Sequence, residues 1–430
     1  MRCLTVTNSI KETEKYMVIN IKKMVERFER YVRIDTQSSE SSETYPSTLK
    51  QLDLSRLLVE ELKKMGAEEV ELTEHGYVFA TIPATTPAEV PVIGFIAHVD
   101  TSPDVSGKNV NPYIHANYQG GDLVLKDDPT QVIKADENPA LENCIGHDII
   151  TSGGTTLLGA DNKAGVAEIM TAAEYLLAHP EIPHGKIRIA FTVDEEVGTG
   201  TQHFDVKQFG ATYAYTIDGE TAGEMEDETF CADTVTIKLK GINIHPGYAK
   251  NKMLNSIKLA SAFIDFLPKD RLSPETTEKR EGYIHPHSMQ GNEEESIIKF
   301  LIRDFTEEGL IEKEDFLKDI LAVFAKKYPK MQSEFILDKS YRNMKYIIDQ
   351  HPQVTEYALE AIERSGLEAK KNLIRGGTDG ARLSYMGIPT PNIFTGGHNF
   401  HSNKEWISIQ DMGKAVETII NLAIIWTEKK

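Results

Sequence analysis

Two short segments restrict the possible fold most strongly, PVIGFIAHVD at residues 91–100 and KIRIAFTVDEE at residues 186–196. Each is almost continuously apolar until its carboxyl end, where histidine or carboxylate residues follow. Such runs are typical of central strands in a sheet whose two faces are both covered by helices. Residues 163–178 between them form a predicted helix, so we expect a layered α/β/α domain.

A second, smaller domain is predicted after residue 228. Val and Ile alternate with Thr and Lys over residues 232–239, as in a half-buried strand. Helices and apolar strands then follow in the order helix, strand, helix, strand, with an extra strand near Tyr283. We therefore predict an inserted α+β, ferredoxin-like domain at residues 229–342. The larger domain is then formed by residues 19–228 and 343–430, preceded by an N-terminal extension at residues 1–18.

Composition excludes several classes of protein. The 430 residues are 40% hydrophobic, which suffices for folded domains with sizeable cores. A formal charge of −19, without a basic stripe, argues against nucleic acid as a partner. The three cysteines, Cys3, Cys144 and Cys231, are far apart, which favours a reducing cytoplasm over a disulfide framework or a zinc ribbon. We expect no membrane partner, because no apolar run approaches the ~18–20 residues of a span. The first residues have no apolar region and no small-residue cleavage site, so we do not expect them to be a secretory signal.

Polar residues at the ends of the predicted strands are the first candidates for chemistry, since charge at such positions is costly unless it is paired. His98 and Asp100 stand two residues apart in an extended segment and therefore point to the same face. His98 could bind a metal while Asp100 orients or polarises its ring. In isolation this pair is more often a surface turn than a metal site.

Asp161 lies at the start of the predicted helix 163–178, so it could equally be an N-cap. The preceding GTTLLG resembles a phosphate loop, but the Lys and Ser or Thr that phosphate binding requires are missing. The three adjacent carboxylates of Asp194, Glu195 and Glu196 repel one another, so they need either full solvation or a nearby cation. Neighbouring side chains of an extended backbone diverge, so one glutamate could bind metal while the other faces a reacting water.

Three further candidates follow later apolar runs. Asp218 is by itself an ordinary turn aspartate, and either His398 or His401 could be a ligand. Charge balance favours a two-metal centre. Asp161, Glu196 and Asp218 supply three negative charges and a bound hydroxide supplies a fourth, which together balance the four positive charges of two Zn²⁺. Such a centre activates water and stabilises an oxyanion. This predicts hydrolysis of a carbonyl compound, with Glu195 as general base.

The motifs HVDTSPD, LLGADNKAG, DEEVG, TIDGE and NFHS together resemble those of a di-zinc metallopeptidase family that includes tripeptide aminopeptidases, acetylornithine deacetylase-like enzymes and carboxypeptidase G-like enzymes. The likeness runs from about Met24 onward and includes SGKNVNP, HPG, RGGTDGA and PNIFTGG. The resemblance implies catalytic positions for Asp100 and Glu195 and a cis peptide after Asp161. It also implies one zinc on His98, Asp161 and Asp218, and a second zinc on Asp161, Glu196 and His401.

The same resemblance implies that the inserted domain is a lid or dimerisation domain, so a homodimer is one expectation. His245 would stabilise the oxyanion, and Arg303 and Arg375 would bind the terminal carboxylate of a peptide. Without the resemblance, His245 is interpreted as a turn residue and the two arginines as structural ion-pair partners. Close members of the family have Tyr at position 398, which leaves His398 without an assigned role.

The expected function is removal of the N-terminal residue from tripeptides through a metal-bridging water and Glu195, with two Zn²⁺ per chain and Co²⁺ or Mn²⁺ as substitutes. An alternative is a related di-zinc hydrolase acting on dipeptides, acylated amino acids or a C-terminal residue, because one metal site supports all of these. A non-catalytic peptide- or metal-binding protein is a third hypothesis, and the presence of Glu195 beside the ligands argues against it.

Overall fold

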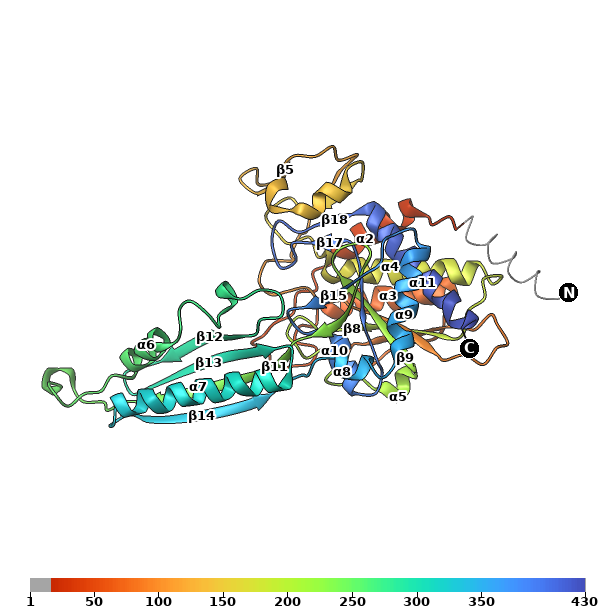
Figure 1. Cartoon of the computed structure of the whole chain (residues 1–430). Coiled ribbons are helices and arrows are strands. Elements are labelled where there is room, and N and C mark those ends of the chain that lie inside the picture. The colour runs from red at the N-terminus through yellow and green to blue at the C-terminus, as the bar shows by residue number, and fades with distance from the viewer. Residues whose placement is uncertain (1–16, 430) are drawn as a thin grey trace. The chain divides into compact units, whose positions relative to one another are not determined.

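The computed structural model describes residues 17–429 of the chain (Figure 1). The predicted extension at residues 1–18 lies almost entirely outside the described residues. Two compact units are present. Among the described residues, the first comprises residues 17–227, Tyr346–Asn372 and residues 378–429, and the second comprises Glu228–Lys345 and Leu373–Gly377. Within the described residues, no helix combines the length and the apolar character that crossing a bilayer requires.

A mixed eight-stranded sheet forms the centre of the first unit. In sheet order its strands are β1 (Glu68–Leu72), β2 (Val78–Ile82), β8 (Ile187–Thr192), β3 (Ile93–His98), β9 (Tyr213–Gly219), β16 (Asn392–Phe394), β10 (Glu224–Thr229) and β15 (Lys370–Ile374). β3 pairs in parallel with both β8 and β9. Every residue of β3 and β8 is buried, as the two apolar segments predicted.

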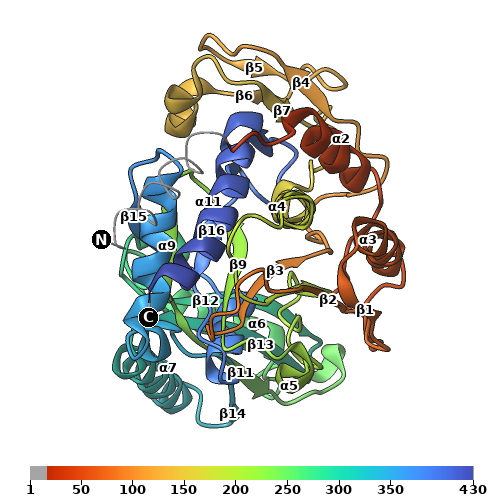
Figure 2. The ribbon, with the colours of Figure 1, turned by 90° about the vertical axis from the view of Figure 1, so that its right-hand side faces the viewer.

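Helices pack on this sheet and on one another. The longer ones are α2 (Ile21–Val32), α3 (Gln51–Met65), α4 (Ala160–Ala178), α9 (Pro352–Arg364) and α11 (Ile409–Glu428), and the short ones are α5 (Val206–Phe209), α8 (Lys345–Ile348) and α10 (Asp379–Tyr385). α4 packs on β3 and β9, and α11 packs against both α4 and α9 (Figure 2). Because it has neighbours on most sides, α4 is buried along nearly its whole length.

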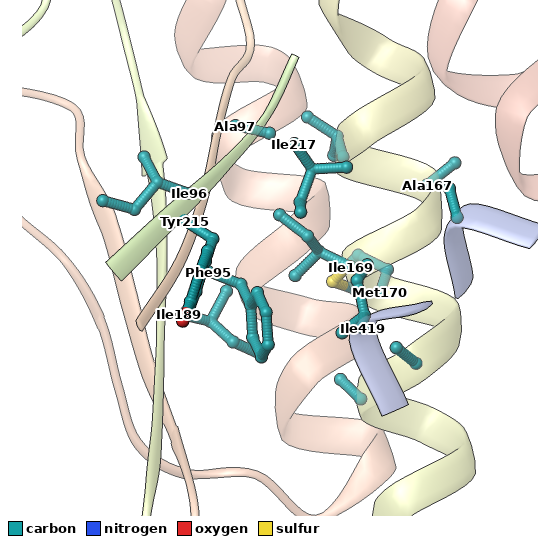
Figure 3. Close-up of a cluster of buried hydrophobic side chains, with 14 of the residues drawn as sticks. Phe95, Ile96, Ala97, Ala167, Ile169, Met170, Ile189, Tyr215, Ile217 and Ile419 are labelled. Atoms are coloured by element: carbon teal, nitrogen blue, oxygen red, sulfur yellow. The ribbon is translucent and has the colours of Figure 1, made fainter. Parts of the chain in front are cut away.

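The core between α4 and the sheet is built from large apolar side chains. Phe95 of β3 and Tyr215 of β9 lie with Ile169 and Met170 of α4 and with Ile419 of α11 (Figure 3). Each of these five residues is at most 1% exposed. This packing holds α4 on the sheet, so the first residues of α4 lie beside the carboxyl ends of β3 and β9.

Two small sheets complete the first unit. One contains β17 (Gly397–His398), β18 (Trp406–Ser408), β7 (Ile149–Thr151) and β4 (Tyr113–His115), and the other contains β5 (Leu123–Val124) and β6 (Val132–Ile133). The 3₁₀ helices η1 (Ala135–Glu137) and η2 (Pro139–Cys144) precede β7. Sequence analysis did not predict these strands, because two or three residues show no usable alternation. The four-stranded small sheet joins residues 113–151 to the segment that carries His398.

The second unit is an α+β sandwich. Its antiparallel sheet has the order β12 (Tyr283–Gly291), β13 (Glu295–Asp304), β11 (Cys231–Lys240) and β14 (Gln332–Lys339), accompanied by α6 (Ser256–Phe266), α7 (Glu307–Lys327), η3 (Pro246–Tyr248) and η4 (Pro274–Thr276). Ile298 and Phe300 of β13 pack with Phe263 of α6 and Leu317 of α7. The predicted fold class, a large layered α/β sheet with an α+β part, is confirmed.

Gly165 marks the closest approach of α4 to the sheet and provides a test of this packing. A Cβ atom at this position would lie 1.9 Å from the main-chain oxygen of Ile217 and 2.5 Å from Asn162 Oδ1. Gly165→Ala must therefore displace α4, and we expect it to lower the free energy of unfolding by about 3 kcal/mol in a denaturant titration.

Gly413→Ala in α11 is the matched control for this variant. The added Cβ would meet only the flexible end of Ile21, at 2.8 Å. We expect a change in unfolding free energy of less than about 1 kcal/mol. Equal effects of the two alanine substitutions would contradict the packing described for α4.

Candidate metal centre

The candidate ligands come together because three neighbouring strands end at one edge of the sheet. His98 is the last residue of β3, Glu195 and Glu196 follow β8, and Asp218 is near the end of β9. Since β8 and β9 both run parallel to β3, their carboxyl ends lie on the same side. In open α/β sheets this edge is the usual position of a ligand site.

Two carboxylates, those of Asp161 and Asp218, converge on His98, which is 2% exposed. Its Nε2 atom lies 3.0 Å from Asp161 Oδ1 and 3.5 Å from Asp218 Oδ1. Asp161 comes from the start of α4, and its peptide bond to Asn162 is cis, as the resemblance implied. The ends of β3, β9 and α4 therefore supply one group of potential ligand atoms.

A second group forms around His401. Its Nε2 atom lies 2.8 Å from Glu196 Oε2 and 3.3 Å from Asp161 Oδ2. The two oxygens of Asp161 thus face different imidazoles, Oδ1 toward His98 and Oδ2 toward His401. The His401 side chain is 43% exposed, so solvent reaches the centre on this side.

The electrostatics of the cluster fit a bound cation. Burial, together with the charge of Asp161, raises the pKa of Glu196 to about 8, and burial raises the pKa of Asp218 to about 6. Glu196 Oε1 is buried without a hydrogen-bond partner among the described residues. Hydrogen bonds to Asp161 and Glu196 raise the pKa of His401 to about 11. Buried carboxylates in such positions require a positive charge to stay ionised.

The types of ligand atom also fit a divalent transition metal. His98, Asp161 and Glu196 can each offer one ligand atom, and these atoms lie within 4.8 Å of one another. Imidazole and carboxylate groups together suit zinc, and they also accept cobalt or manganese. The residues present therefore fit a metal centre, whereas they do not by themselves select one metal.

Asp100 positions the residues around this centre. The Nδ1 atom of His98 lies 3.0 Å from the main-chain oxygen of Asp100 and 3.4 Å from its Oδ1. The same carboxylate accepts hydrogen bonds from the backbone N–H groups of Glu195 and Glu196, at 3.1 and 3.2 Å. Asp100 therefore orients both the imidazole of His98 and the acidic turn.

Glu195 lies farther from His98 than the candidate metal ligands Asp161 and Asp218 do. Its Oε2 atom is 3.9 Å from His98 Nε2, farther than Asp161 or Asp218. Burial raises its pKa well above the ordinary value for glutamate. A carboxylate held at such a position can accept a proton from a reacting water.

The acidic turn also contains a residue for which the structure offers a simpler explanation. Asp194 is buried, and its carboxylate accepts hydrogen bonds from the backbone N–H of Ser47 and from Gln51 Nε2, each at 2.6 Å. Its backbone has a φ of 59°, in the left-handed region. Because these two donors bind its carboxylate, Asp194 does not depend on a cation. The repulsion within the turn is therefore relieved partly by these two hydrogen-bond partners, which the sequence did not reveal.

The alternative interpretation of Asp161 as an N-cap is wrong. The backbone is non-helical at Asp161 and again at Asn162, so the regular part of the helix begins only after Asn162. Asn162 Oδ1 instead accepts a hydrogen bond from the backbone N–H of Gly165, at 3.2 Å. This capping bond leaves the Asp161 carboxylate available to the two histidines.

Glu405 is a supporting residue whose role sequence analysis missed. It is 1% exposed, and its Oε2 accepts hydrogen bonds from the backbone N–H groups of Leu158 and Gly159, both at 2.7 Å. Its Oε1 accepts a third from the N–H of Asp161, at 2.9 Å. One buried carboxylate thus holds the turn that carries Asp161. The only sequence signal was an acidic residue four positions after His401.

The three predicted substrate-binding residues belong to the second unit. His245 is exposed, and its Nδ1 accepts a hydrogen bond from Gly247 N–H. Arg303 donates to the main-chain oxygens of Asp233 and Ile302. Arg375 donates to main-chain oxygens at 277, 279 and 281. Contacts to a peptide by these residues stay predictions.

A further cluster of potential ligands has a structural explanation. Cys144 Sγ lies 3.8 Å from Asp411 Oδ2, and His147 Nδ1 lies 3.7 Å from Asp411 Oδ1. Ser408 accepts a hydrogen bond from Asp411 N–H at the start of α11 and lies 2.9 Å from His147 Nδ1. These contacts join η2 to the first turn of α11.

Comparison with known proteins identifies one family and one group of relatives. The model of peptidase family M20/M25/M40 matches residues 159–424. Peptidase T of Geobacillus thermodenitrificans (strain NG80-2) is 50% identical over 406 residues, which cover 94% of this chain and 98% of that protein.

Solved structures show the same fold. The aminopeptidase PepT of Bacillus cereus ATCC 10987 has a TM-score of 0.72 at 23% identity and covers 95% of this chain and 99% of its own. A tripeptidase of Staphylococcus aureus subsp. aureus Mu50 has a TM-score of 0.75 at 21% identity, covering 96% and 100%. The YXEP protein of Bacillus subtilis, a dinuclear metal binding peptidase from the M20 family, has a TM-score of 0.63 at 14% identity, covering 95% and 99%.

Glu405→Gln tests the support of Asp161. The amide keeps the shape of the side chain, but it replaces one accepting oxygen with an NH₂ group that faces a backbone donor. We expect zinc affinity to fall about 10- to 100-fold, which is typical when a residue that orients a metal ligand is replaced. Competition with a chromophoric chelator measures this affinity. Glu363→Gln, at an exposed position of α9, is the control, and equal affinities of the two variants would contradict the role of Glu405.

Proposed function

The chain belongs to peptidase family M20/M25/M40 and is a peptidase, and we propose that it is an aminopeptidase that removes the first residue of tripeptides. The 50% identical relative is named Peptidase T, and neighbours in fold include an aminopeptidase and a tripeptidase. The observation that carries the proposal is the Asp161 carboxylate, whose two oxygens face His98 and His401. That arrangement suits a carboxylate shared by two metal ions.

The proposed cofactor is a pair of Zn²⁺ ions. His98, Asp161 and Asp218 would hold one ion, while Asp161, Glu196 and His401 would hold the other. When bound, such a pair activates water and stabilises negative charge on a carbonyl oxygen. The dinuclear metal binding neighbour supports a two-ion centre, and the ligand types would also accept Co²⁺ or Mn²⁺.

Glu195 is the proposed general base. Its carboxylate would take a proton from the attacking water and deliver it to the nitrogen of the departing dipeptide. Asp100 keeps the acceptor in position through the backbone N–H of Glu195 and orients His98 at the same time.

The second unit is proposed to contribute to substrate binding. His245 would stabilise the oxyanion, and Arg303 and Arg375 would bind the terminal carboxylate of the peptide. Arg303 and Arg375 already donate to main-chain carbonyls, so a peptide would use the donors that stay free. The lid or dimerisation role of the insertion, the homodimer and the cytoplasmic location stay predictions.

A peptide panel tests the substrate class. We expect zinc-loaded protein to cleave alanyl-glycyl-leucine into alanine and glycyl-leucine, faster than it cleaves the dipeptide, the tetrapeptide or the N-acetylated tripeptide. Mass spectrometry of the products distinguishes the two ends. Release of leucine, or faster cleavage of the acetylated peptide, would favour the related hydrolases that act on a C-terminal residue or on acylated amino acids.

Glu195→Gln tests the general base. Loss of the proton acceptor should lower kcat about 100- to 10,000-fold, the usual contribution of general acid–base catalysis. Metal analysis should still find two zinc ions per chain, because Glu195 is not a proposed ligand. Glu89→Gln, at an exposed loop position, is the control. Normal turnover by a fully loaded Glu195→Gln protein would exclude the assigned base.

A further inference from the structure

A pocket of about 590 Å³ adjoins the candidate metal centre within the first unit. Its lining includes Asp161 and His401, which are proposed metal ligands. The other lining residues come from η1 and η2, from the segment just after β9 and from the segment around β17 and β18, and they include Glu137, Glu220, His398 and Trp406. A molecule in this pocket would therefore lie directly beside the centre.

His398 is the unusual side chain of this pocket. It is only 7% exposed and stacks on Trp406, with ring centroids 4.2 Å apart. Neither ring nitrogen has a hydrogen-bond partner that the structure records among residues 17–429. Burial lowers the pKa of His398 to about 4, so the ring is neutral at pH 7 and carries one donor and one acceptor. Because His398 lines the pocket, its ring nitrogens are available to a ligand that binds there.

The charge of the pocket is negative. Glu137 and Glu220 line it in addition to Asp161, and no lysine or arginine is among its lining residues. Glu220 lies two residues after Asp218, and its main-chain oxygen accepts a hydrogen bond from Gly396 N–H at 2.7 Å. The backbone of Glu220 is therefore held close to the centre, and its exposed side chain lines the pocket. A negative pocket favours a cation over an anion.

A primary ammonium group is the cation that fits the proposed reaction. In a peptide the α-ammonium and the first carbonyl carbon are both bonded to one Cα, so a site for the ammonium must lie within about 4 Å of the site of the carbonyl. A pocket that shares Asp161 and His401 with the metal centre meets this requirement.

We propose that this pocket binds the first residue of the substrate, with Glu220 pairing with its α-ammonium and His398 accepting a hydrogen bond from the same group. This inference rests on the proposed aminopeptidase function and explains how a free N-terminus would be selected. A blocked N-terminus would leave Glu220 without its partner, which costs binding free energy. The competing explanation is that His398 only packs against Trp406 and that the pocket holds solvent.

Equilibrium binding to an inert, zinc-loaded protein tests the proposal without turnover. Glu195→Ala is the background, and calorimetry compares trialanine with propionyl-dialanine, which has the same shape but lacks the amine. Adding Glu220→Gln should weaken trialanine binding about tenfold, the effect of losing one charged hydrogen bond. Binding of propionyl-dialanine should not change.

Two further variants make the result specific. Glu142→Gln, at an exposed position of η2 that does not line the pocket, should leave both affinities unchanged. His398→Phe keeps an aromatic ring against Trp406 but removes the nitrogens, and it should weaken trialanine more than propionyl-dialanine. Equal weakening of both ligands by Glu220→Gln, or no effect on trialanine, would overturn the subsite.

Failure of the subsite and failure of the proposed function give different results. If the wild-type, zinc-loaded protein does not release alanine from trialanine, the aminopeptidase function fails. The binding comparison still decides whether Glu220 and His398 recognise the amine. If the wild-type protein cleaves trialanine and Glu220→Gln has the same KM, the function stands and the subsite is wrong.

Discussion

Several carboxylates buried at one edge of a sheet repel one another, and this repulsion is the constraint on which the site depends. Glu196 and Asp218 have raised pKa values because burial disfavours their charged forms. Asp161 keeps a lowered pKa against the same burial because His98 and His401 both hydrogen-bond to it. A pair of divalent cations between these groups, as proposed above, would remove the conflict and would also supply the chemistry that a peptidase needs.

The rest of the first unit serves to hold these groups in place. The core around Phe95, Met170 and Tyr215 fixes α4 on β3 and β9, and so places Asp161 near His98. Asp100 and Glu405 then act mainly through the backbone. Asp100 accepts the N–H groups of the acidic turn, and Glu405 accepts three N–H groups of the turn before α4. Rigid positioning of this kind limits the reorganisation that metal binding and catalysis would require.

Sequence patterns were sufficient for elements with a strong signal. The continuous apolar runs predicted β3 and β8, and the polar residues at their ends pointed to the edge where His98 and Glu196 now lie close to Asp161 and His401. Patterns failed where a role depends on a distant partner. Asp194 is satisfied by Ser47 and Gln51, and Glu405 binds a turn about 245 positions earlier, so neither role is visible in a local pattern. The strands of the small sheets are too short to show periodicity.

Anomalous diffraction from crystals of the zinc-loaded protein, recorded above and below the zinc absorption edge, tests the central claim most directly. We predict two peaks in the first unit, one between His98, Asp161 and Asp218 and the other between Asp161, Glu196 and His401. A single peak, or zinc bound away from Asp161 in the fully loaded protein, would contradict the account.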